Sequence, residues 1–188
     1  MLGTDSMAVS SSSIQILGAE EVLAQFKSLR SKQPVQYWAI YSSQLGGVVT
    51  DPALMVIPFD DHIVHRGHGI FDTAALVEGK IYDLEAHLDR FLLSAERSKL
   101  RLPASRDGIR DIIVRTTAAS GRRDGSIRYW VSSGPGSLEL TPAAGAEPGF
   151  FVMVFAGLSY PARWYTEGLR VMTTTYPIKA PLYAMTKA

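Results

Sequence analysis

The chain has no cysteine, which excludes disulfide bonds and thiolate metal sites. It also lacks any apolar run close to the ~20 residues that a membrane-spanning helix needs. Its charges nearly cancel, at a formal net charge of +1, and it has no dense basic tract of the kind that binds nucleic acid. What it does have is 46% hydrophobic residues over 188 positions, enough for one domain with a packed core, or for one domain and part of another.

The first 34 residues form a Ser-rich leader followed by a short amphipathic pattern over residues 19–29, which predicts a surface helix. The leader contains an early Asp5 and no arginine before Arg30. A secretory signal does not fit this composition, and a transit peptide is expected to be richer in arginine and poorer in acidic residues. We therefore expect a cytoplasmic protein, with the chloroplast as the alternative.

The pattern over residues 35–175 predicts one α+β domain. Glu78-Gly79 separates two β-branched runs as a hairpin turn. Apolar residues repeat with a period near 3.6 over residues 84–100, and again after the candidate N-cap Ser105, which predicts two helices. We expect an antiparallel sheet flanked by this helical pair. The expected strands are 35–43, a second within 45–50, 70–77, 80–84, 126–133, 149–156 and 169–176.

Three of the four histidines recur at a spacing of three, at His62, His65 and His68. In a strand the first two would face opposite sides, and the glycines at 67 and 69 argue against a helix that continues to the third. A loop could still wrap three ligands around a metal, but the pattern favours polar residues of a β-rich loop, and no metal site is predicted. The two glycines indicate a tight turn or a close approach of the backbone.

Three motifs in order resemble a known family: "HRGHGIFDT", "GKIYDLEAHLDRFLLSAE" and "GSIRYWVSSGPG". The chain is similar, from about residue 38 to 188, to the N-terminal half of the fold-type IV pyridoxal-phosphate enzymes. These comprise branched-chain aminotransferases, D-amino-acid transaminases and aminodeoxychorismate lyase. The resemblance implies the small N-terminal domain of that fold, with the second domain missing from this chain, and pyridoxal 5'-phosphate as cofactor.

The resemblance assigns roles to four residues. Arg90 of "HLDR" matches the arginine that holds the cofactor phosphate, although alone it would pass for a solvated helical arginine. Arg128 matches an arginine that recognises the substrate α-carboxylate, with an ordinary ion pair as the alternative. Phe71 matches an aromatic residue of the substrate pocket, with core packing as the alternative. Arg66 stands where branched-chain members tend to have tyrosine, so the preferred substrate side chain stays open.

The last segment, residues 176–188, matches the family's approach to its catalytic lysine. Composition cannot choose among the chain's six lysines, but the resemblance places Lys187 at the position that forms the Schiff base and shuttles the substrate α-proton. Lys179 lies in the preceding "PIK". The relatives continue into a second domain that holds the cofactor further, so we expect a truncated chain with little activity.

The implied function is pyridoxal-phosphate-dependent transamination between amino acids and 2-oxo acids, with branched-chain or D-amino acids as substrates, in a homodimer. One alternative is aminodeoxychorismate lyase, which makes 4-aminobenzoate and pyruvate with the same cofactor and lysine. Another is a non-catalytic dimerising fragment. The sequence does not distinguish D from L substrates.

Overall fold

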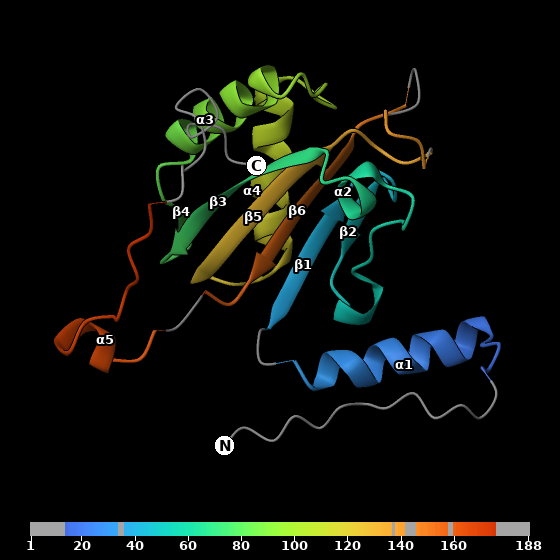
Figure 1. The fold of residues 1–188 in the computed structure, drawn as a ribbon, viewed down its shortest axis with the longest axis horizontal. Coiled ribbons are helices and arrows are strands. Elements are labelled where there is room, and N and C mark those ends of the chain that lie inside the picture. Colours follow the sequence, from blue (N-terminus) through green and yellow to red (C-terminus); the bar gives the residue numbers. More distant parts are fainter. Residues whose placement is uncertain (1–13, 34–35, 137, 142–145, 158–159, 176–188) are drawn as a thin grey trace.

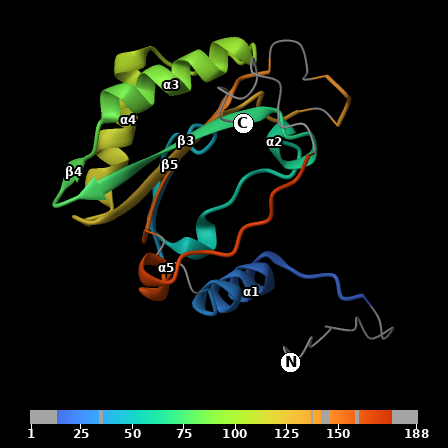
Figure 2. The ribbon, with the colours of Figure 1, turned by 60° about the vertical axis from the view of Figure 1, so that its left-hand side comes forward.

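The structure is a computed structural model that describes residues 14–33, 36–136, 138–141, 146–157 and 160–175. A six-stranded antiparallel sheet in the order β2-β1-β6-β5-β3-β4 forms its centre (Figure 1). Two long helices lie together along one face of this sheet, away from α1 (Ala19–Ser31) and α2 (His62–His65) (Figure 2). The expected α+β architecture is therefore confirmed. The strands are β1 Tyr37–Ser42, β2 Gly47–Val49, β3 Gly69–Val77, β4 Lys80–Ile81, β5 Gly125–Ser132 and β6 Gly149–Phe155.

The core lies between the sheet and these two helices, α3 (Leu84–Arg97) and α4 (Arg106–Ala119). Residues of β3 alternate between buried and partly exposed, as a strand with one face on a core requires. The helices bury apolar residues along one side, including Phe91, whose ring meets that of Tyr129 edge-on at 5.0 Å. The buried cluster also includes Ile70, Leu76, Leu88, Ile109, Ile113, Ile127, Val131, Phe150, Val152 and Val154.

Local signals in the sequence set the helix starts and the hairpin as predicted. The hydroxyl of Ser105 accepts a hydrogen bond from the Gly108 amide at 3.2 Å and so caps α4. Of the residues predicted on one side of α4, Ile109, Ile113 and Thr116 are buried, and Ile112 is half-buried. Glu78 and Gly79 have φ of 51° and 81°, the positive values at both central positions that a type I′ hairpin turn needs.

The predicted N-terminal helix is also present, as α1 (Ala19–Ser31). It buries none of its residues and contacts the short 3-10 helix η1 (Pro52–Leu54) rather than the core. In Figure 1 it lies below the start of β1, while α3 crosses the far end of the sheet. The helix therefore lies on the surface of the domain and is not part of its core.

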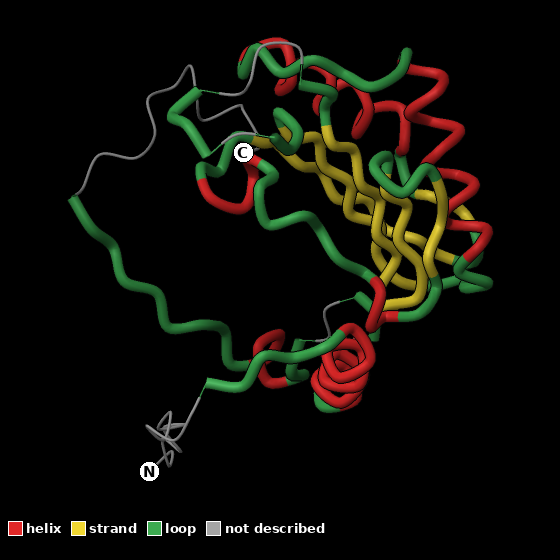
Figure 3. Tube along the Cα trace, turned by 90° about the vertical axis from the view of Figure 1, so that its right-hand side faces the viewer, coloured by secondary structure: helices red, strands yellow, loops and turns green. Residues whose placement is uncertain are grey.

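The strand predicted over residues 169–176 is wrong for the part that the structure describes. Residues 169–175 are irregular and exposed, and they run away from the sheet after the short helix α5 (Arg163–Thr166), which the sequence did not predict (Figure 3). A β-branched run becomes a strand only where a neighbouring strand takes up its backbone N–H and C=O groups. No strand pairs with 169–175 among the described residues.

The prediction that the histidines lie in a loop is also wrong for His62 to His65. His62–His65 form the one-turn helix α2, because the carboxylate of Asp61 accepts a hydrogen bond from the Ile63 amide at 3.0 Å and caps it. The helix ends before Gly67, as the glycines indicated. His62 is buried rather than solvated.

Candidate functional site

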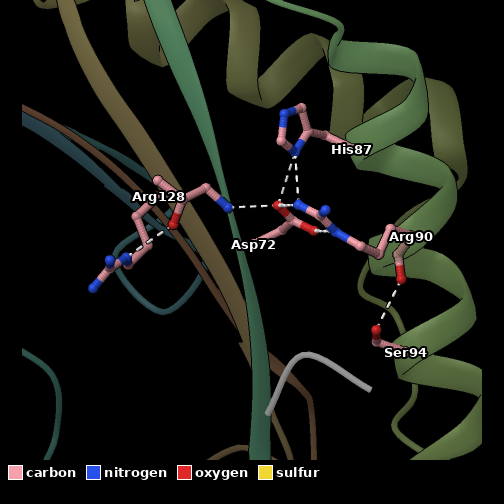
Figure 4. Close-up of polar contacts among 6 residues, drawn as sticks. Asp72, His87, Arg90, Ser94 and Arg128 are labelled. Carbon is pink, nitrogen blue, oxygen red and sulfur yellow. Dashed lines mark hydrogen bonds and ion pairs between the residues drawn. The ribbon is translucent and has the colours of Figure 1, made fainter. Parts of the chain in front are cut away.

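A buried carboxylate, Asp72, is the centre of the candidate site. It occupies a core-facing position of β3 and has no exposed side-chain surface. The guanidinium of Arg90, from α3, grips it with two hydrogen bonds of 2.6 Å, from Nε to Oδ2 and from Nη2 to Oδ1 (Figure 4). Such a fork fixes the plane of the guanidinium as well as its distance.

Two further donors complete the shell of Asp72. The Thr73 amide donates to Oδ1 at 2.6 Å, and His87 Nδ1 lies 2.9 Å from the same oxygen. Because a carboxylate can only accept, His87 Nδ1 must carry a proton here. Its contact with Arg90 Nη2 at 3.0 Å is then a close approach of two donors that share one acceptor.

These contacts control the ionisation of both partners. Burial by itself raises the pKa of Asp72, but the hydrogen bonds from Arg90, His87 and the Thr73 amide outweigh it, so this pKa lies below its ordinary value. The hydrogen bond to Asp72 raises the pKa of Arg90. Asp72 and Arg90 therefore remain charged together at neutral pH.

Arg90 is oriented by this pair but not enclosed by it. Its side chain keeps 45% of its surface exposed, while Asp72 beneath it has none. Among the described residues no hydrogen bond engages Arg90 Nη1, because the pair with Asp72 uses Nε and Nη2. The predicted phosphate-binding arginine thus presents a fixed guanidinium edge to its surroundings.

Arg128 and Phe71 come together on the opposite face of the sheet. The Arg128 guanidinium carbon lies 5.1 Å from the centre of the Phe71 ring, and Nε donates to the Thr73 hydroxyl at 3.1 Å. Phe71 and Thr73 flank Asp72 in the chain, so the alternation of β3 sends them to the other face. Figure 4 shows Arg128 on the opposite side of β3 from Arg90. The ion pair considered for Arg128 is not found among the described residues.

The Arg90 and Arg128 groups lie on opposite faces of β3, and the outer edge of this strand is open over most of its length. β4 pairs only with Leu76 and Val77 of β3, so the described chain leaves the outer edge of β3 from Gly69 to Ala75 without a neighbouring strand.

The remaining predicted site residues are not part of this cluster. Arg66 is exposed and donates to the carbonyls of Glu139 and Leu138, each at 3.4 Å. Lys187 and Lys179 lie outside the described residues. The roles predicted for Arg66 and Lys187 therefore stay predictions.

The histidines form a second polar cluster, under the turn that leads into β3. The Nδ1 atoms of His62 and His68 lie 3.1 Å apart, and the ring centres of His62 and His65 are separated by 4.7 Å. Asp61, buried beside them, accepts hydrogen bonds from Ser132 and Gln44. In the part of the chain that the structure describes, no group of three His, Cys, Asp or Glu residues is arranged to hold a metal ion.

Two functional candidates, Asp72 and His87, were not predicted from the sequence. Both stand inside the motifs quoted above, and each left a usable signal. Asp72 is an acidic residue among the core-facing positions of an apolar strand, and such a carboxylate requires a partner. His87 precedes Arg90 by three residues on a helix, so the two side chains are neighbours.

The family model "Amino-transferase class IV" matches residues 69–185. "D-amino-acid transaminase, chloroplastic" from Arabidopsis thaliana is 43% identical over 93% of this chain and 46% of its own length. The fold matches a branched-chain amino acid aminotransferase of Escherichia coli (TM-score 0.60, 16% identity, 68% of this chain, 43% of that one). It also matches 4-amino-4-deoxychorismate lyase of Pseudomonas aeruginosa (TM-score 0.56, 24% identity, 70% and 45%).

The chain spans less than half the length of the curated relatives it matches, for example 46% of the Arabidopsis protein. No helix among the described residues is long and apolar enough to cross a membrane. The family match covers most of the chain, including β3, α3 and β5, on which the Asp72, Arg90 and Arg128 groups lie. The chain therefore belongs to the class IV aminotransferases, the fold-type IV family.

Proposed function

We propose that the chain is the N-terminal part of a pyridoxal-phosphate-dependent aminotransferase that moves an amino group between an amino acid and a 2-oxo acid. The observation that carries this proposal is Arg90, a partly exposed guanidinium held in one orientation by the buried Asp72. Membership of the class IV aminotransferases indicates the type of reaction, the transfer of an amino group. The named Arabidopsis relative favours D-amino acids as the substrate class.

The residues present fit the phosphate of this cofactor. Asp72 offsets the charge of Arg90, so attraction comes from directed N–H donors rather than from net charge. The free edge of Arg90 offers such donors in a fixed plane, which suits phosphate oxygens. When bound, pyridoxal phosphate supplies an electron sink for the substrate α-carbon.

The chain's own residues would then share the work around the open edge of β3. Arg90 would hold the phosphate on the helix side. On the other side, Arg128 would hold the substrate carboxylate and the Phe71 ring would exclude water beside it; their mutual contact supports this pairing. We propose Lys187 as the residue attached to the cofactor, moving the proton at the α-carbon. Arg66 would act on the substrate side chain.

Cofactor binding can be tested without relying on turnover. The protein is dialysed against pyridoxal phosphate, or against pyridoxal, which has no phosphate. The absorbance of the bound compound is then measured in each case. Arg90→Lys keeps a cation beside Asp72 but loses the fork, and we expect it to weaken binding of pyridoxal phosphate about tenfold and of pyridoxal little. Arg97→Gln, at the exposed end of the same helix, is the matched control. Equal weakening for both compounds would exclude Arg90 from the phosphate site.

The reaction is tested by product analysis. With D-alanine and 2-oxoglutarate we expect amino transfer that Lys187→Ala abolishes. The same protein supplied with aminodeoxychorismate should give no 4-aminobenzoate or pyruvate. Formation of those two products instead would assign the chain to the lyase.

We also propose that the protein works as a homodimer and acts in the chloroplast. Self-association is supported by exposed apolar side chains between β1 and α2, including Leu45, Val56 and Phe59. Gel filtration with light scattering tests the dimer, which a monomer at all concentrations would contradict.

The chloroplast is favoured by the name of the Arabidopsis relative. Imaging of a fluorescent fusion in plant cells tests it, and a purely cytosolic signal would return the assignment to the cytoplasm.

A further inference from the structure

A groove of about 500 Å³ lies between α1, the start of β1 and η1, away from the Arg90 cluster. Its lining is rich in cations: Lys27 and Arg30 from the last turns of α1, and Arg122 from the turn after α4. The volume falls within the range of pockets that hold metabolite-sized ligands. The function proposed above makes no use of this groove.

In the described part of the chain, the three cations lack the acidic partners that several other arginines have. On the surface of α3 and α4, Arg106 and Arg110 are paired with Glu85, and Arg115 with Asp111. Within the described chain, no such ion pair is found for the cations of the groove. Among the described residues of the lining, the one acidic side chain is Asp51, which uses one carboxylate oxygen to cap η1 through the Ala53 amide.

Two aromatic rings hold the arginines in place. The guanidinium carbon of Arg30 lies 5.6 Å from the ring centre of Tyr37, and that of Arg122 lies 4.9 Å from the ring centre of Trp38. Trp38 is itself fixed against the backbone, because a Cβ on Gly125 would lie only 2.6 Å from its ring. A guanidinium stacked on a ring keeps its N–H edge free for an acceptor.

Trp38, one of the lining residues, also carries a buried donor without an acceptor in the described structure. Trp38 Nε1 is buried, and no hydrogen-bond partner for it is found in the described structure. Buried N–H groups of folded proteins nearly always have a partner. An anion with several oxygens in the groove could accept hydrogen bonds from the three cations together.

We propose that this groove binds a small organic anion that carries at least two negative charges on phosphate or paired carboxylate groups. Two negative charges are needed to balance three cations against one carboxylate. The site is independent of the cofactor site, since it shares no residue with the Arg90 and Arg128 clusters.

The test is a titration of the 188-residue chain followed by tryptophan fluorescence and calorimetry, at constant ionic strength. Pyrophosphate and citrate are the probes, and the tighter of the two identifies the phosphate or the carboxylate chemistry. We expect saturable binding that Arg122→Gln weakens about five- to tenfold, since a charge-assisted hydrogen bond is lost. Trp38→Phe should remove the fluorescence response.

Two variants act as controls. Arg115→Gln removes an equal charge from the exposed side of α4 and should change the affinity less than about twofold. Arg97→Gln, at the exposed end of α3, should likewise change the affinity less than about twofold. If Arg122→Gln is unfolded by circular dichroism, Lys27→Gln replaces it. Binding that fails to saturate, or an equal loss in Arg115→Gln, would overturn the proposal.

Discussion

At the scale of single residues, the position of Asp72 explains why Arg90 points where it does. A carboxylate on the core side of a strand is stable only if it is hydrogen-bonded, and the four donors around it provide this. In return, the carboxylate removes most of the rotational freedom of a long side chain. The orientation of Arg90 therefore depends on Asp72 of β3 as much as on the helix α3 that carries it.

Replacing Asp72 by asparagine should loosen this arrangement. We expect Asp72→Asn to lower the free energy of unfolding by about 1–2 kcal/mol, a figure reduced because Arg90 is half exposed to solvent. Urea denaturation measures it. Asp111→Asn, which breaks an exposed pair with Arg115, should cost less than ~0.5 kcal/mol. Equal effects of both substitutions would show that burial of Asp72 contributes nothing.

The stabilising effect of Asp72 should depend on pH with a definite sign. Its pKa is lowered from an ordinary value of 3.8, so the folded protein binds this proton more weakly than the unfolded chain. The stabilisation is complete above 3.8 and disappears as the pH falls through the lower, folded value. Urea denaturation of wild type and Asp72→Asn between about pH 6 and pH 3 should give converging curves. A difference that grows toward acid would contradict this.

At the scale of elements, the turn from α2 into β3 sets the direction of the site strand. Gly67 has φ of 68°, which favours glycine, and Gly69 is pressed against its surroundings. The sequence predicted a tight turn or a close approach here, and the structure shows one at each glycine. The turn leads directly to Phe71 and Asp72, so its geometry sets which face of the sheet each residue takes.

A side chain at Gly69 should therefore be poorly tolerated. A Cβ there would lie 2.6 Å from Ile63 Cδ1 and 2.9 Å from the Val131 carbonyl oxygen, and the latter cannot move without shifting β5. We expect Gly69→Ala to lower the free energy of unfolding by about 1–3 kcal/mol, measured by thermal and urea denaturation. Gly47→Ala is the control, because nothing lies within 4 Å of that Cβ and its φ is ordinary. An unchanged midpoint for Gly69→Ala would show that the turn relaxes.

At the scale of the whole molecule, one hydrophobic layer between the sheet and the helices α3 and α4 holds the domain together. Phe91 lies near its middle, fully buried, with the rings of Tyr129 and Phe150 at 5.0 and 6.2 Å. Since Arg90 immediately precedes Phe91 in the same helix, the core contact of Phe91 also fixes the height of Arg90 over β3.

Truncating Phe91 should weaken the entire fold. We expect Phe91→Ala to cost about 3–5 kcal/mol, a large share of the ~5–15 kcal/mol that stabilise a domain of this size. Urea denaturation followed by circular dichroism measures the loss. Leu93→Ala, 41% exposed on the same helix, should cost less than about 1 kcal/mol. Similar losses for the two would indicate that α3 is not anchored through this ring.

The sequence by itself determined the elements whose signals are local. A period near 3.6 and the cap at Ser105 predicted α3 and α4, and Glu78-Gly79 predicted the hairpin, because neighbouring residues carry each of these preferences. The resemblance to the family likewise selected Arg90, Arg128 and Phe71 as candidates one by one, and their roles stay predictions.

Only the tertiary structure decided which of these residues meet. Asp72 is 18 positions from Arg90, and their pairing depends on the packing of α3 over β3, which no local pattern records. Alternation along β3 put Phe71 and Arg128 on the other face, with an open edge between the two groups. The failed strand at 169–175 has the same cause, because a strand exists only where a distant segment pairs with it.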